Sequence, residues 1–180
     1  IRDRPTEDAV NQNITDIARR ISGADPAVMQ AIHSCISDIS TYCSEHAGQY
    51  EDRNTDPAQA SPLELKWLGM VDILLGHGYA WELDWKCELD DLRFALGEIR
   101  KKNQEAECLT EALGDGTFDE DDDLTTWCAG LSEACPRHTV GCLGIDSDSY
   151  VIFPVQKQIL NQLQQAAGQI GQKITPAENG

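Results

Sequence analysis

Apolar residues recur at spacings of three and four through the N-terminal part of this chain, and that periodicity dictates amphipathic helices. Residues 6–22 carry one such stripe, which Gly23 ends. Asp25 is placed to cap a second helix that starts at Pro26, where the missing N–H costs nothing. The two expected buried faces consist of Val10, Ile14, Ile17 and Ile21, and of Val28, Ile32, Cys35, Ile36, Ile39 and Cys43. We therefore predict an N-terminal helical pair within residues 1–47.

The remaining chain predicts more helices and then a change to a strand pattern. Polar loops are expected at 48–60 and 114–123, and further helices at 61–75, 88–102, 123–135 and 157–168. Residues 139–145 and 150–155 are rich in β-branched and aromatic side chains, and turn-forming residues separate them. The expected class is α+β, mostly helical, with five to six helices and a small antiparallel sheet that includes a C-terminal hairpin.

The charge balance narrows the class of partner. Fourteen Lys and Arg oppose 31 Asp and Glu, which leaves a net charge of −17 over 180 residues. Nucleic-acid binding needs basic residues that release counterions, and anionic membranes attract basic surfaces, so both partners are disfavoured. No apolar stretch approaches the length of a membrane span. A basic protein partner is the class that this charge favours.

The most extreme local feature is the run Asp119, Glu120, Asp121, Asp122 and Asp123. We interpret it as a contact for a basic protein surface, because clustered charge speeds encounter and selects among partners. A solvated, self-repelling loop beside a helix N-terminus is the plainer alternative. A cation site is disfavoured, since the run lacks the ligand and glycine spacing of a calcium loop.

Two further segments are candidates for partner binding. The first segment combines aromatic and acidic side chains, a composition that suits a binding hot spot beside a polar rim. The second segment surrounds the expected hairpin turn. The candidate residues are Trp81, Glu82 and Asp84, and Asp146, Asp148 and Tyr150. The alternatives are that a tryptophan anchors the core and that the aspartates merely form the turn.

The seven cysteines are odd in number and evenly scattered, which argues against a closed disulfide framework and favours buried thiols in a reducing cytoplasm. Two C-x-x-H pairs, Cys43 with His46 and Cys135 with His138, form a possible zinc site, with Cys142 as a third thiolate. Packing of Cys43 and solvation of His46 is the favoured alternative, so no cofactor is expected. The P-loop, nucleophile-elbow, dinucleotide and zinc-protease motifs are missing from the sequence, which favours a non-enzymatic role.

Two motifs together resemble a known family. Leu83-Asp84-Trp85-Lys86 precedes acidic residues and an amphipathic helix, and the run from Gly144 to Tyr150 leads into apolar residues and a helix. Their order and separation resemble an uncharacterised bacterial family, domain of unknown function 6630, over residues 63–174. The resemblance implies no catalytic residues. It implies a small bacterial cytoplasmic protein of a sort often found in toxin–immunity gene clusters.

The leading hypothesis is therefore a bacterial immunity-type protein that inhibits a toxin domain through an acidic surface. A housekeeping binding module or adaptor is the alternative, and a metal-dependent hydrolase using Asp84, Asp146 and Asp148 is the third. We expect one domain over residues 1–180, with a fraying tail at 175–180. The periplasm is the alternative to the cytoplasm, because the sequence starts at Ile1 and a removed signal peptide is compatible with that start.

Overall fold

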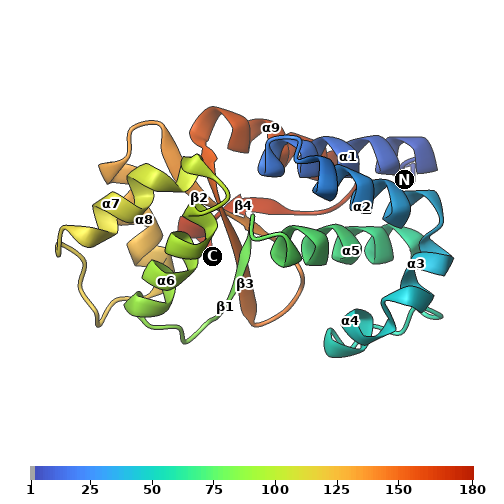
Figure 1. The fold of residues 1–180 in the computed structure, drawn as a ribbon, viewed down its shortest axis with the longest axis horizontal. Coiled ribbons are helices and arrows are strands. Elements are labelled where there is room, and N and C mark those ends of the chain that lie inside the picture. Colours follow the sequence, from blue (N-terminus) through green and yellow to red (C-terminus); the bar gives the residue numbers. More distant parts are fainter. Residues whose placement is uncertain (1–2) are drawn as a thin grey trace. The chain divides into compact units, whose positions relative to one another are not determined.

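The computed structural model describes residues 3–180 of the chain. The chain divides into two compact units, Ile1–His77 (unit 1) and Gly78–Gly180 (unit 2). The expected α+β class is confirmed, with nine α-helices and a four-stranded antiparallel sheet in the described residues (Figure 1). The helix count exceeds the five to six expected, because short helices occupy a segment predicted as a loop, part of a longer predicted helix and residues 103–113, for which no element was predicted. A single domain over the whole chain stays a prediction.

Unit 1 is helical and starts with the predicted pair, α1 (Glu7–Ser22) and α2 (Pro26–Ser37). Thr6 and Asp25 cap these helices, and Gly23 ends α1 with a φ of 61°. The helix expected to continue to Cys43 instead breaks at Asp38, whose side chain accepts from the Thr41 N–H at 3.1 Å and so starts a new helix. The additional helices are α3 (Ile39–Glu45) and α4 (Ala47–Asp52), the latter within the expected loop.

The central helix of unit 1 is α5 (Pro62–Gly76), which contacts α1, α2 and α3. Ser61 caps it through the Glu64 N–H, as the sequence predicts. Every residue from Leu65 to Val71 is buried, so the helix is enclosed on all sides. Lys66 belongs to this stretch and bonds through Nζ to Asn11 Oδ1 at 2.9 Å.

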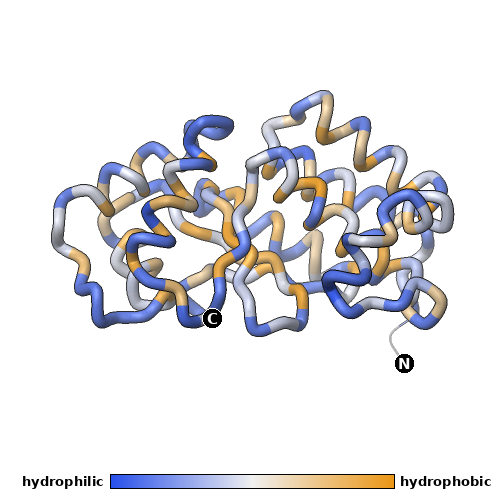
Figure 2. The backbone as a smooth tube through the Cα atoms, turned by 60° about the horizontal axis from the view of Figure 1, so that its bottom comes forward, coloured by the Kyte–Doolittle hydropathy of each residue, from blue (hydrophilic) through white to orange (hydrophobic). Residues whose placement is uncertain are grey.

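Unit 2 is built on the sheet, whose strand order is β1-β3-β2-β4. The strands are β1 (Trp81–Asp84), β2 (His138–Leu143), β3 (Ser149–Gln156) and β4 (Ile174–Pro176), all antiparallel to their neighbours. The predicted hairpin is confirmed as β2 and β3. Most residues of β2 and β3 are buried, and Figure 2 shows hydrophobic stretches alternating with hydrophilic ones along the chain.

Four helices pack around this sheet, and their apolar side chains form the core of unit 2 together with those of the strands. They are α6 (Leu89–Arg100), α7 (Glu107–Gly114), α8 (Leu124–Ala134) and α9 (Lys157–Gln169), with 3₁₀ turns at Gln104–Ala106 and Ala177–Asn179. Val140, Cys142 and Ile152 pack with α6, α7 and α8 in one core. Side chains alternate along a strand, so Val151 and Phe153 lie on the opposite face of the sheet. The helix α9 contacts β2, β3 and β4.

The C-terminal tail differs from the expectation of fraying. Ile174–Pro176 pairs with β2, and Ala177 is buried in the core beside α8. The tail is therefore anchored by backbone pairing and by one buried side chain, neither of which leaves a periodic pattern in so short a segment. No helix in residues 3–180 is long and apolar enough to cross a membrane.

Candidate partner-binding surface

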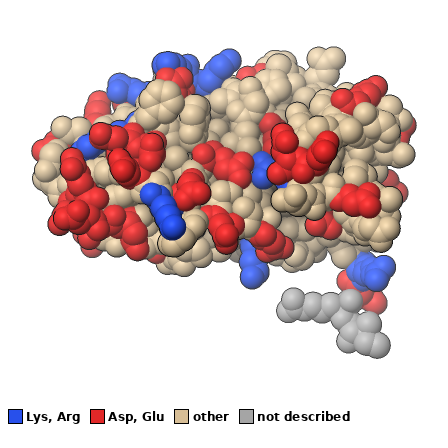
Figure 3. Space-filling view, turned by 90° about the horizontal axis from the view of Figure 1, so that it is seen from below, with Lys and Arg blue, Asp and Glu red and all other residues tan. Residues whose placement is uncertain are grey.

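Residues 103–136 of unit 2, which we call the acidic segment, contain ten Asp and Glu and no Lys or Arg. The segment runs from the end of α6 through α7 and α8. Seen from below, acidic side chains gather over the part of unit 2 where α6, α7 and α8 lie, with few basic side chains among them (Figure 3). Unit 2 holds 19 acidic and eight basic residues, so it carries most of the negative charge.

The loop before α8, residues 115–123, is held against the helix that follows it. The indole Nε1–H of buried Trp127 donates to the Asp119 carbonyl oxygen at 2.7 Å. The ring of Phe118 lies over Gly130, where an added Cβ would come within 2.8 Å of it. The Asp119 carboxylate accepts from the Asp121 N–H at 3.0 Å. These contacts give the acidic run a defined conformation within the loop that the sequence predicted.

The five acidic side chains of the run have different roles. Asp123 caps α8 by accepting from the Thr126 N–H and the Thr125 hydroxyl, both at 2.9 Å. The Thr126 hydrogen bond is the main cause that holds the pKa of the Asp123 carboxyl below its usual range. The side chains with no hydrogen bond or ion pair within residues 3–180 are Glu120, Asp121 and Asp122, and all three are exposed. These three carboxylates are therefore the ones available to a partner.

A disulfide brackets this loop and corrects the expectation that the cysteines are unpaired. Cys108 in α7 bonds to Cys135 just after α8, with their Cα atoms 6.2 Å apart and a sequence separation of 27. The spacing in the sequence could not reveal this pair, because pairing depends on how α7 and α8 pack. The remaining five cysteines are free thiols.

The same bridge removes support for the zinc alternative. Cys135 has no thiolate to offer, and His138 Nε2 bonds to Glu105 Oε2 at 2.5 Å. Cys43 is buried in unit 1, and His46 bonds through Nδ1 to a backbone carbonyl. Within the described part of the chain, no group of three or more His, Cys, Asp or Glu is arranged to hold a metal ion.

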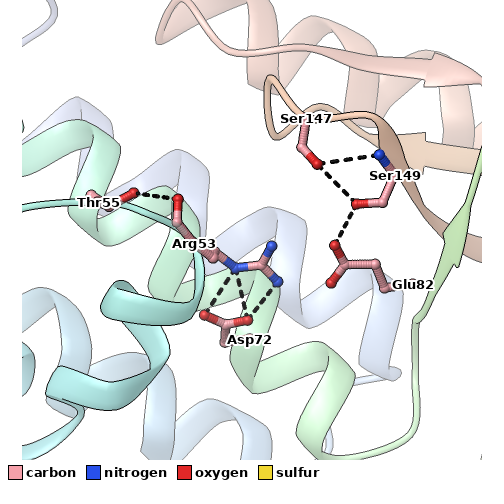
Figure 4. Close-up of polar contacts among 6 residues, drawn as sticks. All are labelled: Arg53, Thr55, Asp72, Glu82, Ser147 and Ser149. Carbon is pink, nitrogen blue, oxygen red and sulfur yellow. Dashed lines mark hydrogen bonds and ion pairs between the residues drawn. The ribbon is translucent and has the colours of Figure 1, made fainter.

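The two motifs that carry the family resemblance lie next to each other, because β1 pairs with the start of β3. Glu82 Oε1 accepts from the Ser149 hydroxyl at 2.5 Å, and Ser147 Oγ lies 3.0 Å from Ser149 Oγ (Figure 4). Asp84 accepts from the Lys86 N–H at 2.8 Å and so shapes the turn after β1. Two of the predicted contact residues, Glu82 and Asp84, thus have partners within the protein.

The other predicted residues of this region differ in exposure. Asp146 and Asp148 are exposed in the hairpin turn, and Asp146 has a left-handed φ of 51°. Trp81 and Tyr150 are only partly buried and pack against the core of unit 2. The pairing of β1 with β3 brings Trp81 and Tyr150 onto neighbouring strands, and Asp146 and Asp148 lie in the turn that precedes β3.

Two aromatic side chains are exposed: Trp85, which belongs to the first family motif, and Phe94, which the sequence reasoning overlooked. Trp85 and Phe94 are 56% and 60% exposed, and Lys86 Nζ lies 4.7 Å from the Trp85 ring centroid. Phe94 contacts Trp81 edge-on, with ring centroids 5.5 Å apart. The available signal was the position of Phe94 outside the apolar stripe of α6. Exposed aromatic side chains beside acidic residues are typical of protein-binding surfaces.

Comparisons with known proteins identify the family of this chain. The comparisons with curated proteins and with solved structures found no match. The family model described as "Domain of unknown function (DUF6630)" matches residues 13–177. The match therefore extends from α1 to the buried tail, well beyond the residues 63–174 that the motifs suggested. Because it spans nearly the whole chain, this protein belongs to the DUF6630 family.

Proposed function

We propose that this chain is a bacterial immunity-type protein that binds a basic toxin or effector domain through the acidic segment and inhibits it. The observation that carries the proposal is the acidic segment itself, ten carboxylates with no basic residue over residues 103–136. An inhibitor of this type needs a rigid scaffold and a complementary surface, and it needs no catalysis of its own.

The local structure supports this role in a specific way. Glu120, Asp121 and Asp122 face solvent on a loop that the Trp127 hydrogen bond and the Phe118 ring hold in place. A partner that contacts these carboxylates does not have to order the loop first, so less binding energy is lost on association. Their clustered charge would speed encounter with a basic surface, and added salt would slow it.

The test uses two variants of equal net charge. The loop-neutral variant carries Glu120→Gln, Asp121→Asn and Asp122→Asn. The matched control removes three exposed charges from unit 1 through Glu51→Gln, Asp52→Asn and Glu64→Gln. Each protein is immobilised and exposed to extract of its own host at low salt, and the captured chains are identified by native mass spectrometry.

We expect the wild type and the matched control to retain the same basic polypeptide and the loop-neutral variant to lose it. The captured partner is then expressed alone and together with this chain. Inhibition predicts that the partner arrests growth alone and that co-expression restores growth. Retention of the same partner by the loop-neutral variant would remove the acidic run from the binding surface.

A housekeeping binding module or adaptor is the second candidate, and the exposed pair Trp85 and Phe94 is equally suited to it. A captured partner that leaves growth unaffected would favour this candidate. The third interpretation, a metal-dependent hydrolase with Asp84, Asp146 and Asp148, gains no support, since Asp84 is engaged by the Lys86 N–H. We therefore propose that the protein acts by binding.

For the location we propose the bacterial cytoplasm, which the family resemblance implies, and keep the periplasm as the alternative that the disulfide supports. Disulfides persist in oxidising compartments, so the Cys108–Cys135 bridge favours the periplasm. Alkylation of free thiols in intact host cells, followed by mass spectrometry, distinguishes the two. Modified Cys108 and Cys135 would favour the cytoplasm, and an unmodified pair would favour the periplasm.

A further inference from the structure

A pocket of about 380 Å³ lies within unit 1, among α2, α3, α4 and α5. Its lining includes two of the four histidines of the chain, His46 and His77, together with Glu45 and Asp72. The volume is at the lower end of the range for small-molecule sites, roughly 300–1,000 Å³. The pocket plays no part in the proposed inhibitor function, which concerns unit 2.

Both histidines are held with the same ring nitrogen toward the backbone. His46 Nδ1 lies 2.9 Å from the Tyr42 carbonyl oxygen, and His77 Nδ1 lies 2.9 Å from the Ile73 carbonyl oxygen. A carbonyl oxygen only accepts hydrogen bonds, so each Nδ1 carries the proton. In the neutral form of each ring, Nε2 then carries no proton and can accept a hydrogen bond.

The charges around the pocket favour a cation. Among the described residues no Lys or Arg lines it, and Glu45 contributes an exposed carboxylate. Asp72 is already engaged by Arg53, whose Nη2 lies 2.7 Å from Asp72 Oδ1 (Figure 4). The pocket also lies at the C-terminal end of α5, a helix of 15 residues that ends at Gly76 and has His77 as its C-cap. The helix dipole makes the electrostatic potential at this end negative, which favours a cation.

The lining also contains an aromatic surface. The Tyr42 and His46 rings stack with centroids 3.9 Å apart and an interplanar angle of 20°. Together with Ile73, the stacked rings give the lining an apolar surface against which the alkyl part of an organic cation can pack. A bare metal ion is a poorer occupant, because in the described residues no three His, Cys, Asp or Glu side chains are arranged closely enough to hold one.

We propose that this pocket binds an organic cation, an alkyl ammonium or alkyl guanidinium group. The ligand N–H groups would donate to His46 Nε2, His77 Nε2 and the Glu45 carboxylate, and the alkyl part would lie against Ile73. The same chemistry has two sources, a small free amine and a Lys or Arg side chain of a polypeptide.

The test uses long-range ¹⁵N–¹H NMR of the histidine rings, which resolves the tautomer of each. The probes are n-butylguanidinium, n-butylammonium and a capped Gly-Arg-Gly peptide, with n-butylurea as the uncharged match. We expect the Nδ1–H tautomer for His46 and His77 in the free protein. We also expect each cation to shift the Nε2 signals of these two rings, while those of His33 and His138 stay unchanged.

Glu45→Gln should weaken cation binding about tenfold, because a charge-assisted hydrogen bond is lost. Its matched control is Glu51→Gln, an exposed carboxylate outside the lining, which should leave binding unchanged. Tighter binding of the peptide than of n-butylguanidinium would support a polypeptide source, and the reverse would support a free amine. The proposal is overturned if no cation shifts His46 and His77 up to about 50 mM, or if n-butylurea produces the same shifts.

Discussion

The length of the loop that the Cys108–Cys135 disulfide closes allows us to predict how much the bridge contributes to stability. The bridge joins residues 27 apart in sequence and closes a loop that contains α8 and the acidic run. In the chain-entropy account, a cross-link of this span lowers the entropy of the unfolded chain by an amount worth about 3.5 kcal/mol at 25 °C. Reduction of the bridge should therefore lower the free energy of unfolding of unit 2 by roughly 3.5 kcal/mol.

The assay is urea unfolding of the wild type with and without a phosphine reductant, followed by tryptophan fluorescence and far-UV circular dichroism. The amino-acid sequence is the same with and without the reductant, so a difference in the free energy of unfolding is attributed to the bridge. The control is the double variant Cys108→Ala and Cys135→Ala, whose unfolding should not respond to the reductant. A change below about 1 kcal/mol in the wild type would refute the entropic account of this bridge.

Three further predictions concern single residues. Gly141→Ala places a Cβ 2.5 Å from the Phe153 ring on the neighbouring strand, so the free energy of unfolding measured in urea should fall by about 1–3 kcal/mol. Trp127→Phe removes the indole hydrogen bond to the Asp119 carbonyl, so amides 119–122 should exchange faster with solvent, while unchanged exchange would mean that the bond does not hold the loop. Asp123→Ala removes the N-cap of α8 and should lower the melting temperature. Because the pKa of the Asp123 carboxyl is lowered in the folded protein, this decrease should be complete above about pH 4. It should become smaller as the pH falls through the pKa of the folded state. A pH-independent difference would contradict this assignment.

Most of the regular structure could be predicted from periodicity and capping. The stripes of α1 and α2 and the Ser61 cap of α5 place these helices correctly. The break at Asp38 could not be predicted in the same way, since the apolar pattern continues across it and only the Thr41 hydrogen bonds reveal the new start. The tail strand β4 was also overlooked, because three residues contain no period and their pairing with β2 depends on tertiary structure.

The candidate surface was predictable in composition and not in detail. The acidic run is evident in the sequence, but the division between supporting and available carboxylates depends on contacts with α8. Asp119 and Asp123 have local hydrogen bonds, whereas the carboxylates of Glu120, Asp121 and Asp122 have no partner among residues 3–180. The disulfide was likewise invisible, because it depends on the packing of α7 against α8.

The central claim is that Glu120, Asp121 and Asp122 attract a basic partner. The most direct measurement is the association rate of the captured partner with the wild type, the loop-neutral variant and the charge-matched control, over a range of salt concentrations. We predict that the loop-neutral variant associates at least about tenfold more slowly at low salt and that its rate depends less on salt, while the matched control follows the wild type. Equal rates and equal salt dependence for all three proteins would contradict the account.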